Sequence, residues 1–289
     1  MKWAFYNEID RYCCDWISNL MDAGHIRPGV ICDKPIQELT VDDVRGYERC
    51  HFFAGIGVWD YALNLAGWNG PVWTGSCPCQ PFSAAGRGAG FGDERHLWPH
   101  WARLIGECRP DTVFGEQVSS KDGRAWFDFV SADLEALGYA VGALATTAAG
   151  VGAPHIRQRL YFVGDSEREG LQEQRRDGGI PRSQVESLAR QGAERAGAST
   201  GEKPGYSLGL RSKNQGTAWG APERGAVNGF WRDAIWLPCI DGKARATQPG
   251  LFPLASGITN RVGRLRAYGN AIVAPQASEF IKAYMECRP

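Results

Sequence analysis

The strongest constraint on the fold is an alternation of short apolar runs with amphipathic segments from the N-terminus to about residue 164. Such alternation is typical of strands that alternate with helices. The predicted strands are Trp3–Asn7, His51–Ala54, Val72–Gly75, Thr112–Gly115, Ala140–Ala145 and Leu160–Gly164. The predicted helices are Arg11–Ala23, Trp59–Ala66, His96–Cys108 and Phe127–Leu137. We therefore expect an α/β fold with a doubly wound, mostly parallel sheet that helices cover on both faces.

The chain changes character after Asp165. From there to about Lys203 it is rich in Gly, Gln, Glu and Arg, which indicates either a flexible insertion or a marginally folded segment. Aromatic residues return between Tyr206 and Trp236 and indicate a small second module. The stretch Leu265–Met285 has a helical pattern and is expected to return to the first domain. The predicted organisation is a first domain over residues 1–164, completed by 257–289, and a module over 165–256, with 165–203 flexible.

Composition indicates a soluble globular protein, because 43% of the residues are hydrophobic and 22% are charged. No stretch is long and apolar enough to span a membrane, and the first residues lack a signal-peptide pattern. The nine cysteines are odd in number and irregularly spaced, which favours a reducing compartment. We therefore expect a cytoplasmic protein. Cys77 and Cys79 complete no tetrahedral ligand set, so no metal site is expected.

The formal net charge is zero, so no global field favours nucleic acid. Basic residues nevertheless outnumber acidic ones between residues 204 and 250, and they are Arg211, Lys213, Arg224, Arg232, Lys243 and Arg245. Three more arginines follow at positions 261, 264 and 266. This local excess fits a phosphate-binding surface and a solvated basic face equally well.

A cysteine between two prolines is the most informative motif for function. Cys79 lies in Pro78–Pro81, after the apolar segment Pro71–Thr74 and before the glycine-rich run Gly86–Gly92. Cysteine is the best nucleophile among side chains, and a rigid turn of this kind exposes its sulfur toward a cleft. Taken alone, such a cysteine also fits a small core residue.

Five segments together resemble the DNA cytosine-5 methyltransferase family. Pro78–Gln80 resembles its nucleophile motif, and His51–Gly57 resembles its first motif, a strand that runs into a glycine turn. The other three are Gly115–Val118, similar to the Glu-Asn-Val signature, Gly152–Arg159, similar to the Pro-Gln-x-Arg-x-Arg run, and Tyr268–Ile272, similar to the closing Gly-Asn motif. The resemblance covers residues 3–164 and 261–284. Gln117 and His155 depart from the family's pattern.

The order of the motifs departs from the family as well. Only about twenty residues separate Gly57 from Cys79, too few for the two strand-helix units that the family places there. Two segments near the N-terminus resemble the motifs that are missing there. Tyr6–Asp10 resembles the second motif, and Asp33 with its neighbours resembles the third. We therefore predict a circular permutation, with two cofactor-binding strands first. Such a change is physically permitted because a doubly wound sheet binds its ligand at the carboxyl ends of strands, whatever their chain order.

The resemblance implies S-adenosylmethionine as the cofactor. Gly55 and Gly57 let the backbone approach the ligand, and Phe53 packs on the adenine. Glu8 accepts hydrogen bonds from the ribose hydroxyls, and Asp33 accepts one from the adenine amino group. The remaining cofactor-binding residues that the resemblance implies are Ile9, Ala54, Asn270 and Ala271.

The resemblance also assigns catalytic roles. Cys79 attacks C6 of cytosine, which makes C5 electron-rich enough to accept the methyl group. Glu116 holds or protonates N3, a role that needs a carboxyl group with a raised pKa. Arg159 binds O2, and Arg157 orients either the loop or Glu116.

Double-stranded DNA is the implied substrate, and its cytosine must be flipped out of the stack before sulfur can reach C6. The loop Ala84–Glu94 is expected to close over the flipped nucleotide, and the module over 165–256 to recognise the target. The predicted DNA-binding residues are Gln80, Ser83, Arg87, Arg95 and Arg232. We expect a monomer that needs no protein partner.

Three other interpretations remain. The first keeps the fold but changes the substrate to RNA. The second is a DNA-binding relic without turnover, which the presence of Cys79, Glu116 and Arg159 disfavours. The third is a folate-dependent enzyme that attacks C6 of free nucleotides, which the separate basic and aromatic module disfavours.

Overall fold

The computed structural model describes residues 4–78, 97–166, 229–238, 244–251 and 269–288. Within them a seven-stranded sheet has the order β2-β1-β3-β4-β5-β7-β6. Its strands are β1 (Ala4–Asn7), β2 (Gly29–Cys32), β3 (Arg49–Phe52), β4 (Val72–Gly75), β5 (Thr112–Val118), β6 (Ala140–Thr147) and β7 (Gln158–Asp165). The strands from β2 to β5 pair in parallel, whereas β7 runs antiparallel to β5 and β6. The predicted mostly parallel sheet is confirmed.

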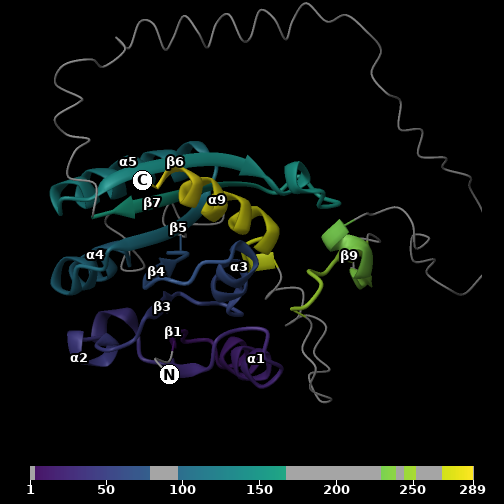
Figure 1. Ribbon diagram of the computed structural model, residues 1–289, viewed down its shortest axis with the longest axis horizontal. Helices are drawn as coiled ribbons and strands as arrows, with labels where there is room; N and C mark the ends of the chain where they lie inside the picture. The colour runs from purple at the N-terminus through teal and green to yellow at the C-terminus, as the bar shows by residue number, and fades with distance from the viewer. Residues whose placement is uncertain (1–3, 79–96, 167–228, 239–243, 252–268, 289) are drawn as a thin grey trace, which may run out of the picture. The chain divides into compact units, whose positions relative to one another are not determined.

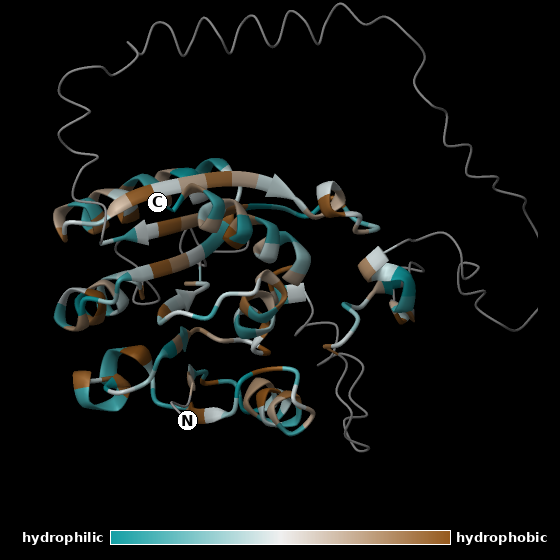
Figure 2. Ribbon diagram, in the orientation of Figure 1, coloured by the Kyte–Doolittle hydropathy of each residue, from teal (hydrophilic) through white to brown (hydrophobic). Residues whose placement is uncertain are grey.

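Helices cover both faces of this sheet, as predicted (Figure 1). One face carries α1 (Arg11–Asp22), α3 (Val58–Ala66) and α9 (Ala274–Cys287), and the other carries α2 (Val41–Val44), α4 (Trp98–Cys108) and α5 (Lys121–Ala136). Every residue of β3 and β4 is buried, as expected for parallel strands between two helical layers. Figure 2 shows the apolar stretches of β5 and β7 between helices that carry many hydrophilic residues.

Shorter elements complete the described part of the chain. Three 3-10 helices are η1 (Ile36–Glu38), η4 (Ala148–Val151) and η5 (Gly229–Asp233). A separate antiparallel pair consists of β8 (Trp236–Pro238) and β9 (Ala244–Ala246). The C-terminal helix α9 shares a buried core with α1 and α3.

Helix α5 begins elsewhere than its sequence pattern predicts. It begins at Lys121 rather than Phe127, because the Ser120 side chain accepts a hydrogen bond from the Gly123 amide at 3.0 Å and caps the helix. A side chain at Gly123 would overlap the Val118 carbonyl oxygen, which explains a glycine in this first turn. Helix α9 begins at Ala274, with a proline in its first turn.

Strand β2 had no residue range among the predicted strands, although the permuted motif order implied a strand before Asp33. It has four residues and lies at one edge of the sheet, where a short segment leaves little periodicity to recognise. It pairs in parallel with β1 over its whole length.

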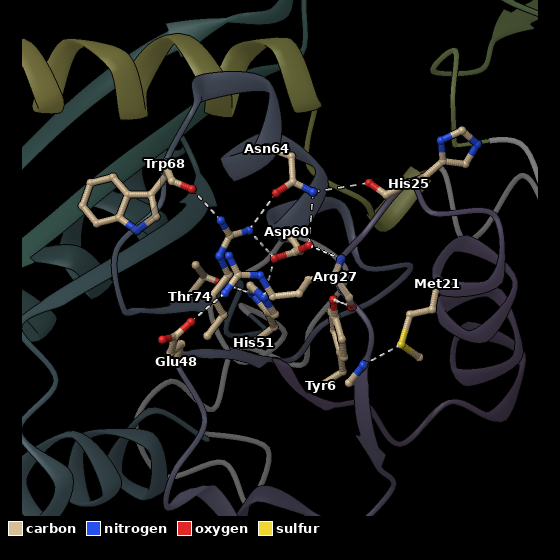
Figure 3. Close-up of polar contacts among 12 residues, drawn as sticks. Tyr6, Met21, His25, Arg27, Glu48, His51, Asp60, Asn64, Trp68 and Thr74 are labelled. Atoms are coloured by element: carbon tan, nitrogen blue, oxygen red, sulfur yellow. Dashed lines mark hydrogen bonds and ion pairs between the residues drawn. The ribbon is translucent and has the colours of Figure 1, made fainter. Parts of the chain in front are cut away.

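A buried ion pair attaches helix α3 to strand β3 (Figure 3). The Arg49 Nη1 atom lies 2.6 Å from Asp60 Oδ1, and the side chains are 1% and 0% exposed. Arg49 also donates to the Asn64 side chain at 2.8 Å and to the Trp68 carbonyl oxygen. Asp60 accepts a further hydrogen bond from the Arg27 amide at 2.6 Å. The three partners of Arg49 are Asp60 and Asn64 on α3 and Trp68 just after it, so the guanidinium fixes the helix against the start of β3.

His51 extends this network toward β1 and β4. Its Nδ1 atom lies 2.7 Å from Thr74 Oγ1, and its ring stacks on Tyr6 with 4.9 Å between centroids. Burial lowers the pKa of His51. Burial alone would raise the pKa of Asp60, but the adjacent His51 and the charge of Arg49 outweigh it and hold that pKa below its ordinary value.

We predict that Asp60→Asn destabilises the protein by about 3 to 5 kcal/mol, because it leaves the Arg49 charge buried without its partner. The free energy of unfolding in urea measures the change. Asp42→Asn is the control, since Asp42 pairs with Arg45 at 3.2 Å on the exposed surface. Its effect is expected to stay below about 1 kcal/mol. Equal effects of the two substitutions would contradict a dominant role for the buried pair.

The same network predicts a loss of stability in acid. The folded pKa of Asp60 lies below its unfolded value of 3.8, so its contribution is present above that value and is lost as the pH falls through the folded pKa. The lowered pKa of His51 acts in the same direction at higher pH, because the unfolded chain binds that proton first. Urea midpoints measured against pH should therefore fall less steeply below pH about 4 in Asp60→Asn than in wild type. Identical slopes would refute the assignment.

Candidate active site

The carboxyl ends of the central parallel strands meet at one edge of the sheet. Strands β1, β3, β4 and β5 run in the same direction and are neighbours in that order. Their registers bring the last residues of the first three strands alongside Gly115 of β5. The residues that come next along the four strands are Glu8, Phe53, Ser76 and Glu116. Ligand sites of doubly wound sheets lie at this edge.

A tight turn connects β3 to α3. Phe53, Gly55 and Gly57 have positive φ values of 50°, 55° and 78°. At Gly57 a side chain would also come within 3.1 Å of Ile26, so the left-handed backbone and the packing both favour glycine there. At Gly55 nothing lies within 4 Å of the position that a side chain would occupy. The turn therefore leaves open space beside its backbone.

Glu8 fixes this turn. Its Oε2 atom accepts a hydrogen bond from the Gly55 amide at 2.7 Å, and Oε1 accepts one from the Asp10 amide at 2.8 Å. Burial raises the pKa of Glu8, and these two hydrogen bonds oppose the rise. Glu8 therefore joins the end of β1 to the turn after β3, although the two residues lie 47 positions apart in the chain.

A pocket at this edge brings together five of the nine predicted cofactor-binding residues. Its lining is Phe53, Ala54, Gly55, Ile56, Val58, Trp59, Ser76, Asn270, Ala271 and Ile272. Gly57 and Glu8 support its turn from outside the lining. Ile9 is 66% exposed after β1, and Asp33 is exposed after β2.

An acid and a guanidinium face each other beside this pocket. Glu116 on β5 is 7% exposed, and its Oε1 atom lies 2.8 Å from Arg159 Nε on β7. The antiparallel register pairs Arg159 with Val118, so Arg159 is a diagonal neighbour of Glu116 on the same face of the sheet. The structure thus brings together two of the four predicted catalytic residues.

Burial raises the pKa of Glu116, and the charges of Arg159 and Arg157 oppose the rise without cancelling it. A hydrogen bond with Ser76 acts in the same direction as the two arginines. Glu116 is therefore a carboxyl group that holds a proton more readily than an exposed glutamate does.

Arg157 contacts the pocket loop rather than a reacting group. Its Nη2 atom donates to the carbonyl oxygens of Gly269 at 2.9 Å and Ala271 at 2.6 Å. Its backbone has a positive φ of 31°, which is uncommon for a residue other than glycine. Arg157 therefore holds the backbone on both sides of Asn270.

Sequence reasoning missed several supporting residues. The Gln117 side chain donates to the Cys77 carbonyl oxygen at 3.3 Å and accepts from the Val118 amide at 2.8 Å, so it holds the segment that leads into Pro78. Trp59 Nε1 donates to Ser76 Oγ at 3.1 Å inside the pocket. The position of Trp59 just after the glycine turn was a usable signal, whereas nothing in the sequence singled out Ser76.

Of the five predicted DNA-binding residues, the described part of the chain includes Arg232. Arg232 lies exposed in η5. His155 meets Trp231 edge-on, with 5.5 Å between ring centroids. The predicted residues that lie outside the described part of the chain are Cys79, Gln80, Ser83, Arg87 and Arg95.

Among the described residues, no group of three or more His, Cys, Asp or Glu side chains has the arrangement that a metal ion needs. Among the helices described, none has the length and apolar character of a membrane span.

Residues 69–189 match the model of a protein family described as C-5 cytosine-specific DNA methylase. The Type II methyltransferase M.NgoBI of Neisseria gonorrhoeae is 36% identical over 94 residues, which are 31% of this chain and 30% of that protein. The Type II methyltransferase M.BanI of Aneurinibacillus aneurinilyticus is 38% identical over 92 residues, 30% of this chain and 21% of that protein. The matches therefore span less than a third of these relatives.

Among solved structures, a DNMT2 mutant of Spodoptera frugiperda aligns over 62% of this chain and 47% of its own, with 16% identity and a TM-score of 0.39. The family match covers β4 to β7 and so includes Pro78–Gln80, Glu116 and Arg159. Over residues 69–189 this chain is thus similar to the C-5 cytosine-specific DNA methylases.

Proposed function

We propose that this protein transfers a methyl group from S-adenosylmethionine to C5 of cytosine in DNA. The observation that carries the proposal is the pair of buried Glu116 and half-buried Arg159, 2.8 Å apart, beside a pocket formed at the glycine turn. Strand β4 pairs with β5 on the side away from β7, and it leads through Ser76 and Cys77 into Pro78 and Cys79. All three catalytic groups lie within the segment that matches the methylase family.

The carbon to be methylated is a poor nucleophile, so the ring must first be activated. Addition of the Cys79 thiolate to C6 forms a C–S bond and moves electron density toward C5 and N3. After methylation, C5 loses its proton and the C–S bond breaks, which returns the thiolate. Cys79 lies outside the described residues, so its role rests on its motif and on the groups around β4.

Glu116 and Arg159 suit the two polar positions of the cytosine ring. A carboxyl group with a raised pKa can donate a proton to N3 and so stabilise the ring after sulfur has added. Arg159 is 19% exposed, so it remains accessible from the site while it pairs with Glu116. Its guanidinium keeps donor groups available for O2.

The pocket suits S-adenosylmethionine, which supplies an activated methyl group. Gly55 leaves open space where a side chain would lie, so the backbone can approach a ligand closely. Phe53 and Trp59 offer aromatic surfaces in the lining. Asp33 is exposed at the end of β2 and is available to an adenine amino group, whereas both oxygens of Glu8 already accept backbone hydrogen bonds, from Gly55 and Asp10. We assign the remaining cofactor contacts to Ile9, Gly57, Asn270 and Ala271.

The substrate of this proposal is duplex DNA with the target cytosine flipped out, because stacked neighbours block attack perpendicular to the ring. The proposed DNA contacts are Gln80, Ser83, Arg87, Arg95 and Arg232. Residues 1–164 and 257–289 form the proposed catalytic and cofactor-binding domain, and 165–256 form the proposed target-recognition module.

We further propose that the chain is a circular permutation of the family's order. Strands β1 and β2 precede β3, which carries the glycine turn, yet they lie beside β3 on the side away from β4. The Glu8–Gly55 hydrogen bond supports this proposal, because it joins an N-terminal motif to the first motif within one site.

DNA that contains 5-fluorocytosine should form a denaturation-resistant complex with the protein in the presence of S-adenosylmethionine. Fluorine cannot leave as a proton does, so the C–S bond persists. Gel electrophoresis under denaturing conditions measures the complex. Cys79→Ser should abolish it while cofactor binding is retained, and Cys287→Ser is the control at an exposed cysteine far along the chain. A fully active Cys79→Ser enzyme would contradict the proposed mechanism.

The permutation predicts that Asp33→Ala and Glu8→Ala weaken cofactor binding although both residues precede the glycine turn. Glu8→Ala also removes the hydrogen bond to Gly55, so Asp33→Ala is the cleaner variant. Isothermal titration with S-adenosylmethionine measures the affinity. Asp22→Ala is the control, because this exposed residue ends α1 before the start of β2 and lies outside the pocket lining. Unchanged affinity in both test variants would reject the permutation.

A further inference from the structure

One wall of the pocket is a short loop whose backbone is held by two distant side chains. Residues 269–273 precede helix α9, and Asn270, Ala271 and Ile272 line the pocket. Arg157 holds the loop from β7 through the carbonyl oxygens of Gly269 and Ala271. The second side chain that holds it is Gln248, which does not line the pocket.

Gln248 makes two short hydrogen bonds to this loop. Its Nε2 atom donates to the Ile272 carbonyl oxygen at 2.7 Å, and its Oε1 atom accepts from the Ala274 amide at 2.6 Å. The side chain is buried at 5% exposure. Ala274 is the first residue of α9, and amides in a first turn have no partner within their own helix. Gln248 therefore caps α9 and fixes the adjoining pocket wall at once.

The position of Gln248 is itself fixed from two sides. Thr247 exchanges hydrogen bonds with Ile235, because its amide donates to the Ile235 carbonyl oxygen at 2.8 Å and its hydroxyl accepts from the Ile235 amide at 3.2 Å. On the other side, the fully buried Trp16 of α1 donates to the Leu251 carbonyl oxygen at 3.0 Å. The segment 247–251 thus connects η5 and β8 with α1.

We infer that Gln248 is a positioning residue for the pocket, which holds the loop 269–273 in its ligand-binding shape from the base of the proposed target-recognition module. The inference rests on the proposed function for the identity of the ligand. Arg232, one of the proposed DNA contacts, lies three residues before Ile235 in the segment that Thr247 holds. Gln248 is therefore a polar link between that segment and the pocket wall, beside the packing of Trp231 with Val273.

The test replaces Gln248 with methionine, which keeps the length of the side chain but removes both hydrogen-bonding groups. The Ile272 carbonyl and the Ala274 amide then lose a buried partner, which carries an energetic cost. If the cost falls on the loop, affinity for S-adenosylmethionine should drop by about tenfold, as measured by titration of the full chain. KM for the cofactor should rise more than kcat falls, since Gln248 contacts no reacting atom.

Gln276 provides a matched control. It is 1% exposed in the first turn of α9, and its amide atoms have no hydrogen-bond partner among the described residues. Gln276→Met makes the same substitution at an equally buried site near the same helix end, and it should leave the cofactor affinity unchanged. Gln248→Glu retains an acceptor for Ala274 but loses the donor to Ile272, so its affinity should lie between those of wild type and Gln248→Met.

The outcomes separate three cases. Weaker binding in Gln248→Met, with unchanged binding in Gln276→Met, supports the inference. A lower melting temperature with an unchanged dissociation constant would mean that Gln248 only stabilises the fold, which overturns it. If Gln248→Met does not fold, Gln248→Glu decides by the same criterion. Wild-type protein that binds no S-adenosylmethionine would instead overturn the proposed function, together with the assignment that rests on it.

Discussion

The common direction of the central strands is the constraint on which the candidate site depends. Since β1, β3, β4 and β5 end at one edge, residues far apart in the chain become neighbours there. The Glu8–Gly55 hydrogen bond is a local consequence of this arrangement, whereas the Glu116–Arg159 pair depends on the antiparallel register of β5 and β7. Chain order is secondary, because a site at strand ends depends on which strands are adjacent and not on which is made first.

Two ion pairs serve this arrangement in different ways. Arg49 and Asp60 are almost fully buried, share hydrogen bonds with their surroundings and hold α3 against β3. Glu116 and Arg159 lie at the open edge, where burial raises the pKa of the acid and Arg159 keeps 19% of its surface exposed. The Arg49–Asp60 pair is closed to ligands and supports the turn that precedes α3. The Glu116–Arg159 pair remains partly exposed, and we propose that it binds the substrate. Gln117 holds the segment before Pro78, and Arg157 and Gln248 hold residues 269–273, so both segments around the candidate site are fixed by side chains.

Sequence patterns located the central strands, and the predicted range of β4 matched the structure, although the equally buried β3 lies two residues earlier than its predicted range His51–Ala54. The glycine turn after β3 was recognisable by Gly55 and Gly57. The start of α5 was missed because it depends on a cap at Ser120 and on packing at Gly123, which a periodic pattern does not contain. Ser76 and Gln248 were missed for a similar reason: each acts through tertiary contacts alone, and the two partners of Gln248 lie 24 and 26 residues away. The motifs predicted the groups at the site, while the contacts that hold those groups required the fold.

The central claim is that a methyl group is transferred to C5 of cytosine. Duplex DNA incubated with the protein and S-adenosylmethionine bearing a trideuterated methyl group, then digested to nucleosides and separated by mass spectrometry, tests it most directly. The account predicts that the label appears in 5-methyldeoxycytidine and that a matched RNA duplex remains unlabelled. Label on an exocyclic nitrogen, label in RNA alone, or no label in either polymer would contradict it.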